Sequence, residues 1–278
     1  MSNYLRGDEK LLLKDTKYKY DQYVLKVFGY GENKRIKLIH MNVLRNEGVE
    51  DDNDKGKVRG VNSEKLEESI CRTRSKIFEL AFCNPWSWFF TGTLDPKKYD
   101  RTDLKKFHSD LTNWLRQYNR YHGTQIKFLL IPELHTDGKS WHMHGFFYDL
   151  PQEHLTRFQI GDRMGKALAE KVKNGDEVFN WSAYQKKFGF CDLEPIRNAE
   201  AVSKYITKYI SKNLATSVTE LNAHMYYHSR GLQFAQTVKK GSMSTAIDIE
   251  PTYSNEYCDV YWLPYSSELL QELSDGFV

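Results

Sequence analysis

Two histidines one residue apart are the first candidates for chemistry in this sequence. His142 and His144 lie in the segment WHMHGFF (141–147). Side chains two positions apart in a β-strand share a face, so both imidazoles would point the same way and Met143 the other way. Taken alone, such a pair is most simply a half-exposed strand with two polar residues facing water. A ligand role needs a third group on the same face.

Glu133 is the best candidate for that third group. It lies in IKFLLIPELH (126–135), and the following Asp137-Gly138 pair is typical of a two-residue type I′ hairpin turn. In that register Glu133 pairs with His142, with their Cβ atoms about 5 Å apart, and lies diagonally from His144. Two imidazoles and a carboxylate suit a divalent cation with open coordination positions, which could polarise a phosphate oxygen.

This metal hypothesis depends on the hairpin register. His135 is a weaker candidate ligand, about 7 Å along the strand towards the turn. A slip of one residue would send Glu133 to the other face of the sheet.

A second candidate site is the segment KYITKYISK (204–212), in which two tyrosines lie four residues apart between lysines. At helical spacing Tyr205 and Tyr209 share a face, beside an apolar stripe and a lysine stripe. A phenol with a pKa near 10 is a poor nucleophile at neutral pH, but nearby positive charge favours its phenolate. The alternatives are solvated surface residues, or a platform that stacks on single-stranded nucleic acid.

Alternating and helical patterns predict the elements that position these residues. We expect a β-hairpin within the first forty or so residues, a loop over 45–62, a helix over 63–80 and a strand in PWSWFFTGTLDP (85–96). A helix capped by Asp103 buries one apolar stripe, a weaker helix spans 153–173, and the tyrosines lie on a helix over 199–213. The predicted class is α+β, with a central antiparallel sheet that carries the histidine hairpin and is flanked by helices.

Composition excludes few classes of function. The 278 residues are 40% hydrophobic, as in an ordinary globular protein, and a net charge of +3 permits a nucleic-acid partner without requiring one. We find no apolar run long enough for a membrane span and no signal-peptide pattern. The four cysteines form no Cys-x-x-Cys pair, which favours reduced thiols and a cytoplasmic location. Gly138-Lys139-Ser140 lacks the earlier glycine of a phosphate-binding P-loop, since position 133 is Glu.

Three segments, in order, resemble the motifs of HUH-superfamily rolling-circle replication initiators. These are FFTGTLDP (89–96), HMHG (142–145) and YITKYISK (205–212). The repeated Tyr-x-x-Lys resembles the two-tyrosine branch, which includes initiators of small single-stranded DNA phages. The wider stretch of about 72–214 is similar to initiators of Gram-positive phages and plasmids.

The resemblance implies a role for each matching residue. His142 and His144 would bind Mg²⁺ or Mn²⁺, with Glu133 as the acidic ligand on the preceding strand. Tyr205 and Tyr209 would be nucleophiles. Further residues would act on the DNA: Lys208 and Lys212 by orienting the phosphate or stabilising its charge, and Lys204, Thr91 and Thr93 as DNA-contacting or structural groups.

The implied activity is site-specific nicking and rejoining of one DNA strand through a 5′-phosphotyrosine, which initiates and terminates rolling-circle replication. The expected partners are single-stranded or cruciform origin DNA, with a host helicase and polymerase, in the cytoplasm of a bacterial host. Alternatives are a two-tyrosine transposase, a non-catalytic single-stranded DNA-binding protein and a plain metal-dependent hydrolase. We expect the endonuclease domain at 63–230, an N-terminal hairpin and charged linker at 1–62, and a C-terminal extension at 231–278.

Overall fold

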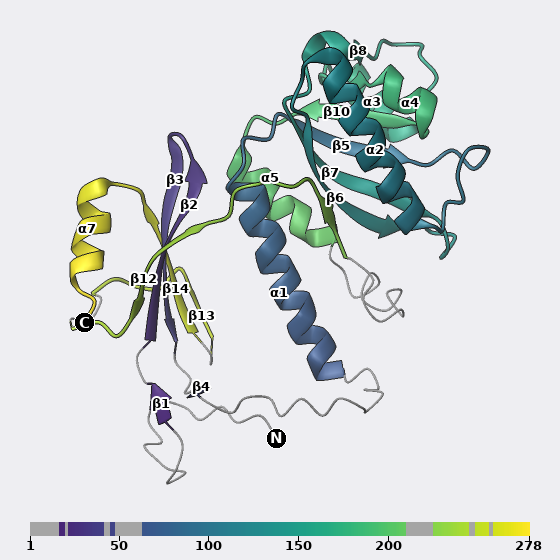
Figure 1. Ribbon diagram of the computed structural model, residues 1–278. Coiled ribbons are helices and arrows are strands. Elements are labelled where there is room, and N and C mark those ends of the chain that lie inside the picture. Colours follow the sequence, from purple (N-terminus) through teal and green to yellow (C-terminus); the bar gives the residue numbers. More distant parts are fainter. Residues whose placement is uncertain are drawn as a thin grey trace. The chain divides into compact units, whose positions relative to one another are not determined.

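The computed structural model describes residues 17–19, 22–41, 45–47, 63–209, 225–244, 248–255 and 258–278. The chain divides into two compact units, one of residues 61–233 and one that joins residues 1–60 with 234–278 (Figure 1). The sequence did not suggest that the two ends of the chain share a unit. Each unit combines an antiparallel sheet with helices, so the predicted α+β class is confirmed.

The unit of residues 61–233 is built on a seven-stranded sheet in the order β11-β6-β7-β5-β10-β9-β8. Its strands are β5 (Trp88–Thr93), β6 (Lys127–Leu134), β7 (Trp141–Tyr148), β8 (Thr156–Arg157), β9 (Phe179–Asn180), β10 (Cys191–Pro195) and β11 (Tyr227–His228). Its helices are α1 (Ser63–Phe82), α2 (Leu104–His122), α3 (Lys166–Lys173), α4 (Ser182–Lys187) and α5 (Ala199–Ile206), with 3₁₀ turns η1 (Gln152–His154) and η2 (Thr207–Tyr209).

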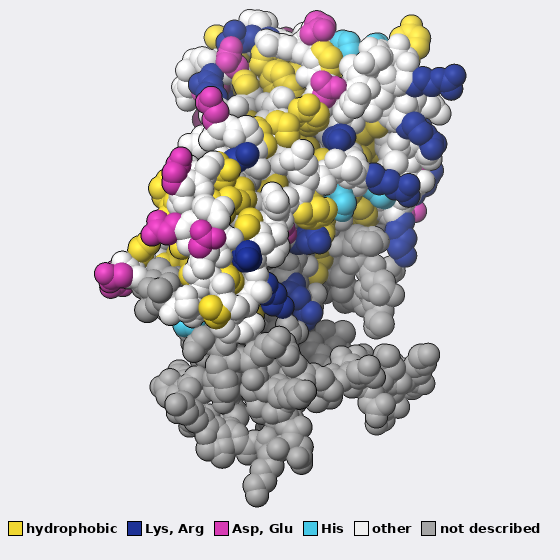
Figure 2. Space-filling model, turned by 60° about the vertical axis from the view of Figure 1, so that its left-hand side comes forward, with side chains coloured by type: hydrophobic (Ala, Val, Ile, Leu, Met, Phe, Trp, Pro, Cys, Tyr) yellow, Lys and Arg dark blue, Asp and Glu magenta, His cyan; other side chains and the backbone are white. Residues whose placement is uncertain are grey.

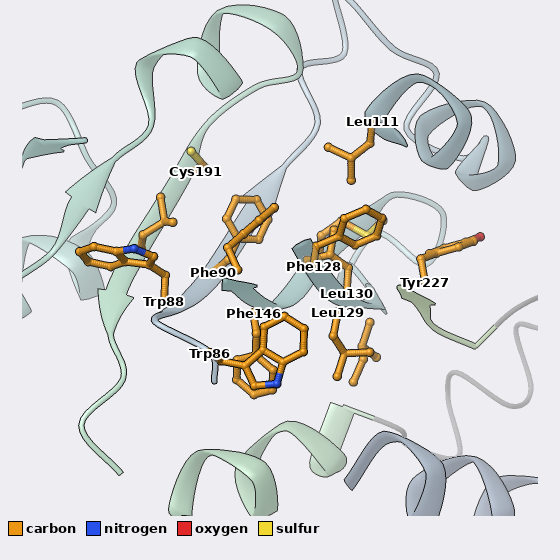
Figure 3. Close-up of a cluster of buried hydrophobic side chains, with 14 of the residues drawn as sticks. Trp86, Trp88, Phe90, Leu111, Phe128, Leu129, Leu130, Phe146, Cys191 and Tyr227 are labelled. Carbon is orange, nitrogen blue, oxygen red and sulfur yellow. The ribbon is translucent and has the colours of Figure 1, made fainter. Parts of the chain in front are cut away.

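Helices cover both faces of this sheet. Figure 3 shows Leu111 of α2 on the same side as Phe128, while Phe146 and Trp86 lie on the opposite side, towards α1 and α5. Strand β5 buries Trp88 and Phe90 on the α2 side, and its alternate residues are only half-buried. The period of two along each strand therefore separates an apolar face from a second face that can hold polar groups.

Helix α2 forms as the sequence predicts. The Asp103 carboxylate accepts a hydrogen bond from the backbone N–H of Lys106, which satisfies one of the free donors at the helix start. Phe107, Leu111 and Leu115 are its buried residues, at helical spacing. The helix ends at Gly123, whose φ of 67° is the left-handed conformation that glycine adopts without strain.

The hairpin of β6 and β7 has the predicted register, with Glu133 paired to His142. The predicted type I′ turn is wrong. The chain turns over four residues, and the N–H of Gly138 donates to the carbonyl of His135. Gly138 has a φ of 67°, whereas Asp137 is not among the described residues with positive φ, and a I′ turn needs positive φ at both central positions. The Asp137 carboxylate instead accepts from the backbone N–H groups of Lys139 and Ser140.

Gly145, next to His144, is required by strand packing. A Cβ atom at this position would clash with the backbone carbonyl of Leu129 on β6. The absence of a side chain therefore lets β6 and β7 approach each other, a sufficient reason for the glycine without a ligand.

The weaker helix predicted over 153–173 is wrong in its first half. The segment begins with η1, continues into β8, and becomes helical only in α3. Gly161 has a φ of 101° and Gly165 is the N-cap residue of α3, so glycines interrupt the periodic pattern.

The second unit contains a five-stranded antiparallel sheet in the order β12-β2-β3-β14-β13. Its elements are β2 (Gln22–Tyr30), β3 (Asn33–Met41), β12 (Gln236–Gly241), β13 (Tyr253–Ser254), β14 (Cys258–Pro264) and α7 (Ser267–Asp275), with β1 (Lys17–Lys19) paired to β4 (Arg45–Glu47). The predicted N-terminal hairpin is confirmed as β2 and β3. Leu25, Ile36 and Leu38 are fully buried and pack with Leu273 of α7.

No helix in the described ranges of the chain is long and apolar enough to cross a membrane. The four cysteines are all free thiols.

Candidate active site

One face of the seven-stranded sheet carries polar side chains in two rows that run across neighbouring strands. In the first row Thr91 of β5 lies between His144 of β7 and Asp192 of β10. In the second row His142 lies between Glu133 of β6 and Thr93 of β5. The two rows are adjacent because successive members on each strand are two residues apart.

Each histidine is held by the threonine beside it. Thr93 Oγ1 lies 3.0 Å from His142 Nδ1, and Thr91 Oγ1 lies 3.4 Å from His144 Nδ1. A hydroxyl can donate or accept a hydrogen bond, so it can serve either tautomer of the imidazole. With Nδ1 occupied, Nε2 is the ring atom of each histidine that is available to a ligand.

His144 Nε2 lies 2.8 Å from a carboxylate oxygen of Glu133. The pKa of His144 is nevertheless lowered to about 4, first by burial of the ring and then by the positive charge of Lys208. Because the ring is largely buried beside a cation, we take the contact with Glu133 as a hydrogen bond from a neutral imidazole and not as an ion pair. A neutral imidazole is also the form that binds a metal.

His142 is in a similar electrostatic state. Burial lowers its pKa, as do the charges of His135, His144 and Arg101, while Glu133 opposes them. The ring of His135 stacks on His142 with centroids 4.7 Å apart, so this weaker candidate does lie beside the pair.

The donor set fits a divalent cation, although its present arrangement is not a metal centre. Within the described residues, no group of three or more His, Cys, Asp or Glu side chains is placed to hold a metal. Glu133 lies against the Nε2 atom of His144, and the two histidine rings are 6.5 Å apart. Glu133 is about half exposed, so its carboxylate can rotate away and share a cation with two neutral imidazoles. The residue types therefore fit Mg²⁺ or Mn²⁺.

The tyrosines lie directly against this histidine pair. The ring of Tyr209 stacks on His144 with centroids 4.1 Å apart and the planes 9° from parallel. The Tyr209 hydroxyl donates a hydrogen bond of 2.9 Å to the Tyr205 hydroxyl. Two motifs about sixty residues apart in the chain thus meet on one face of the sheet.

The two tyrosines differ in exposure and in acidity. Tyr205 is 44% exposed, whereas Tyr209 is 9% exposed. Burial raises the pKa of the Tyr205 phenol, but hydrogen bonds from Lys208 and Tyr209 and the charges of Lys208 and Lys171 outweigh it, so this pKa is lowered overall. Burial and the hydrogen bond to Tyr205 raise the pKa of Tyr209 well above its usual value. The Lys208 ammonium lies 3.5 Å from the centre of the Tyr205 ring.

The remaining predicted residues are placed as follows. Tyr205 ends α5 and Tyr209 lies in η2, so the predicted α-helix tightens into a 3₁₀ turn between the tyrosines. Lys204 is exposed and its ammonium lies 2.8 Å from Glu200, one turn earlier on the helix. Lys212 lies outside the described residues.

The sequence analysis missed Asp192, Glu194 and Lys171. They line a cavity of about 550 Å³ that also has Tyr205 and Tyr209 in its wall. The signal was present, because CDLEP (191–195) alternates buried Cys191 and Leu193 with two acidic residues. Nothing in the sequence said that this strand would lie next to β5.

The surface charge of the protein is divided into small groups. On the face drawn in Figure 2, Lys and Arg side chains form groups separate from those of Asp and Glu. This agrees with the near balance of 40 basic and 37 acidic residues. Local cations such as Lys208, rather than overall charge, therefore set the potential at the tyrosines.

Comparison with known families identifies one match. Residues 87–214, a little under half of the chain, match the family described as replication-associated protein ORF2. The matched segment runs from the start of β5 past η2, so it contains both histidines and both tyrosines. The match is consistent with a rolling-circle replication initiator. No curated protein and no solved structure matches the chain significantly.

Proposed function

We propose that this protein is a metal-dependent endonuclease that nicks and rejoins one DNA strand at a replication origin through a 5′-phosphotyrosine. It would thereby start and end rolling-circle replication. The observation that carries the proposal is the stacking of Tyr209 on His144 together with the hydroxyl contact between Tyr209 and Tyr205. This contact brings two potential nucleophiles and two potential metal ligands within reach of one phosphate.

In the cleavage step, a tyrosine oxygen that has lost its proton to solvent forms a bond to phosphorus. The bond from phosphorus to the 3′ oxygen breaks, the 3′ oxygen takes up a proton, and the 5′ phosphate stays on the tyrosine. The energy of the broken bond is retained, so a later 3′-hydroxyl can rejoin the strand without ATP. The free 3′ end would serve a host polymerase as a primer.

His142, His144 and Glu133 would hold Mg²⁺ or Mn²⁺. When bound, the ion would polarise the scissile phosphate and neutralise part of its charge. Thr91 and Thr93 would position the imidazoles by holding their Nδ1 atoms. These threonines contact the histidines, which favours the structural role over the DNA-contacting one.

Tyr205 would make the first cut. It is the more exposed phenol, it accepts the hydrogen bond from Tyr209, and Lys208 lies beside its ring. A hydrogen bond and an ammonium group both stabilise a phenolate oxygen. Tyr209 would attack the regenerated junction in the second step, for which the 2.9 Å separation of the hydroxyls is suitable.

The test is to incubate the protein with labelled single-stranded origin DNA and Mn²⁺, followed by denaturing electrophoresis. We expect a protein–DNA adduct that survives SDS, is lost in EDTA, and is absent from the Tyr205→Phe/Tyr209→Phe double variant. Tyr205→Phe alone should abolish the first adduct, whereas Tyr209→Phe should retain it and lose the second transfer. Tyr99→Phe, a change of a distant tyrosine, is the matched control.

The same experiment separates the alternatives. Binding without any adduct would indicate a DNA-binding protein, and a free 5′-phosphate without adduct would indicate a hydrolase. A transposase would join the adduct to unrelated target DNA. An adduct that persisted in the double tyrosine variant would sink the proposal.

A further inference from the structure

The cavity of about 550 Å³ beside the tyrosines lies on the opposite side of Thr91 from the histidines. Across the sheet, Thr91 pairs with His144 on one side and with Asp192 on the other. Tyr205 and Tyr209 line the cavity together with residues of β5, β10 and α5. A DNA strand whose phosphate is attacked by Tyr205 must therefore place a neighbouring nucleotide at or near the mouth of this cavity.

The floor of the cavity contains a carboxylate without a hydrogen-bond partner. In the part of the chain that the structure describes, Asp192 accepts no hydrogen bond. Glu194, two residues along the same strand, lies 2.7 Å from the Lys171 ammonium. Burial raises the pKa of Asp192 to about 7, and the charge of Glu194 adds to this effect while Lys171 opposes it. Buried polar groups are normally hydrogen-bonded, so an unpaired carboxylate facing a cavity indicates a ligand that donates.

The walls of the cavity are flat and largely apolar. Phe89 and Tyr205 meet edge to face with ring centroids 5.6 Å apart. Pro195, Ile196 and Val202 complete the apolar surface. Aromatic and aliphatic walls over a polar floor suit a planar ring with hydrogen-bonding groups along one edge.

Two carboxylates on the floor disfavour a phosphate group, because like charges repel and neither residue can donate when ionised. They favour amino groups. Cytosine, adenine and guanine each present an exocyclic amino group that a carboxylate can accept from. Thymine presents two carbonyl oxygens on either side of its single N–H, and these would face the carboxylates.

We propose that this cavity binds one unpaired nucleobase next to the scissile phosphate and selects amino-bearing bases over thymine through Asp192. This inference rests on the proposed nicking function and adds to it the group that reads sequence at one position. Asp192 is then a specificity residue, and it takes no part in the transfer of the phosphate.

The experiment uses the full chain and a single-stranded oligonucleotide pool that is randomised over the cleaved region. After reaction with Mn²⁺, the DNA trapped on the protein and the released 3′-hydroxyl strands are both sequenced. The same pool is also selected for binding in EDTA. We expect one position beside the nick at which thymine is depleted about 10-fold relative to the preferred amino-bearing base.

Asp192→Asn should reduce that depletion to within about 2-fold at the same position and leave preferences elsewhere unchanged. Its added amide can donate to the thymine carbonyl oxygens. Glu194→Gln is a second variant in case Asp192→Asn folds poorly, and it should change the same position. Asp176→Asn is the matched control, because Asp176 is exposed and does not line the cavity.

The outcomes of the two hypotheses are distinguishable. If adducts form but thymine is tolerated equally at every position beside the nick, the cavity inference is wrong while the nicking proposal stands. An unchanged preference in both variants would overturn it in the same way. If no adduct forms, the nicking proposal fails, and the pool bound in EDTA still reports whether thymine is excluded through Asp192.

Discussion

The two faces of the seven-stranded sheet use the same strands in opposite ways. On the α2 side, Phe90, Met143 and Phe147 are fully buried, and aromatic rings pack in contact. On the other side, the alternate residues of the same strands are His142, His144 and their threonine partners. Each strand thus uses one half of its residues for stability and the other half for polar groups. The apolar face provides the rigidity that holds the polar face in place.

The largest effect should come from the apolar face. Phe147→Ala removes a fully buried ring that contacts Phe90 and Trp181, and we expect a loss of about 3–5 kcal/mol in the free energy of unfolding. Denaturant titration followed by tryptophan fluorescence measures this. His142→Ala, on the other face of the same strand, is the control and should cost far less stability while abolishing metal-dependent nicking. Equal stability losses in the two variants would contradict the division between the faces.

Asp192 should make the polar face costly at high pH. Its pKa in the folded protein is about 7, above the usual 3.8, so the unfolded chain releases this proton first. On this account stability falls as pH rises from about 4 to 7. Asp192→Asn should therefore raise the free energy of unfolding by up to about 4 kcal/mol at pH 7.5, and by little at pH 4. A stability difference that did not grow with pH would argue against a desolvated carboxylate.

The threonines should affect metal binding more than folding. Thr93→Val keeps the shape of the side chain but removes the hydroxyl at 3.0 Å from His142, and we expect Mn²⁺ affinity to fall by about 10- to 100-fold. Isothermal titration calorimetry measures the affinity directly. Thr93→Ser restores the hydroxyl and should recover most of the loss, which a purely structural role of the methyl group would not allow.

The smallest effect should come from Lys204, at the edge of the polar face. Its exposed pair with Glu200 contributes about 0.3–0.5 kcal/mol at most, so Lys204→Ala should leave stability almost unchanged. If Lys204 contacts DNA as the sequence predicts, the variant should lower the slope of log affinity against log salt by about 1. A salt slope equal to that of wild type would remove Lys204 from the DNA-contacting residues.

Local patterns predicted much of the fold and part of the site. The cap at Asp103, the stripe of α2 and the pairing of Glu133 with His142 follow from short-range rules, and all three are confirmed. The turn type was wrong because the Asp137 carboxylate binds two backbone N–H groups and supports a longer turn. The register survived this error, since alternation of buried and exposed residues also specifies it.

By itself, the sequence determined which residues share a face. Side chains two apart on a strand, or four apart on a helix, are neighbours whatever the rest of the chain does, so the histidine pair and the tyrosine pair could each be identified locally. Only the tertiary structure decided that Tyr209 stacks on His144, that Tyr205 is the more acidic phenol, and that Asp192 joins the same row through Thr91. Those relations depend on the order of strands in the sheet and on the burial of each group, which are set by packing between distant segments.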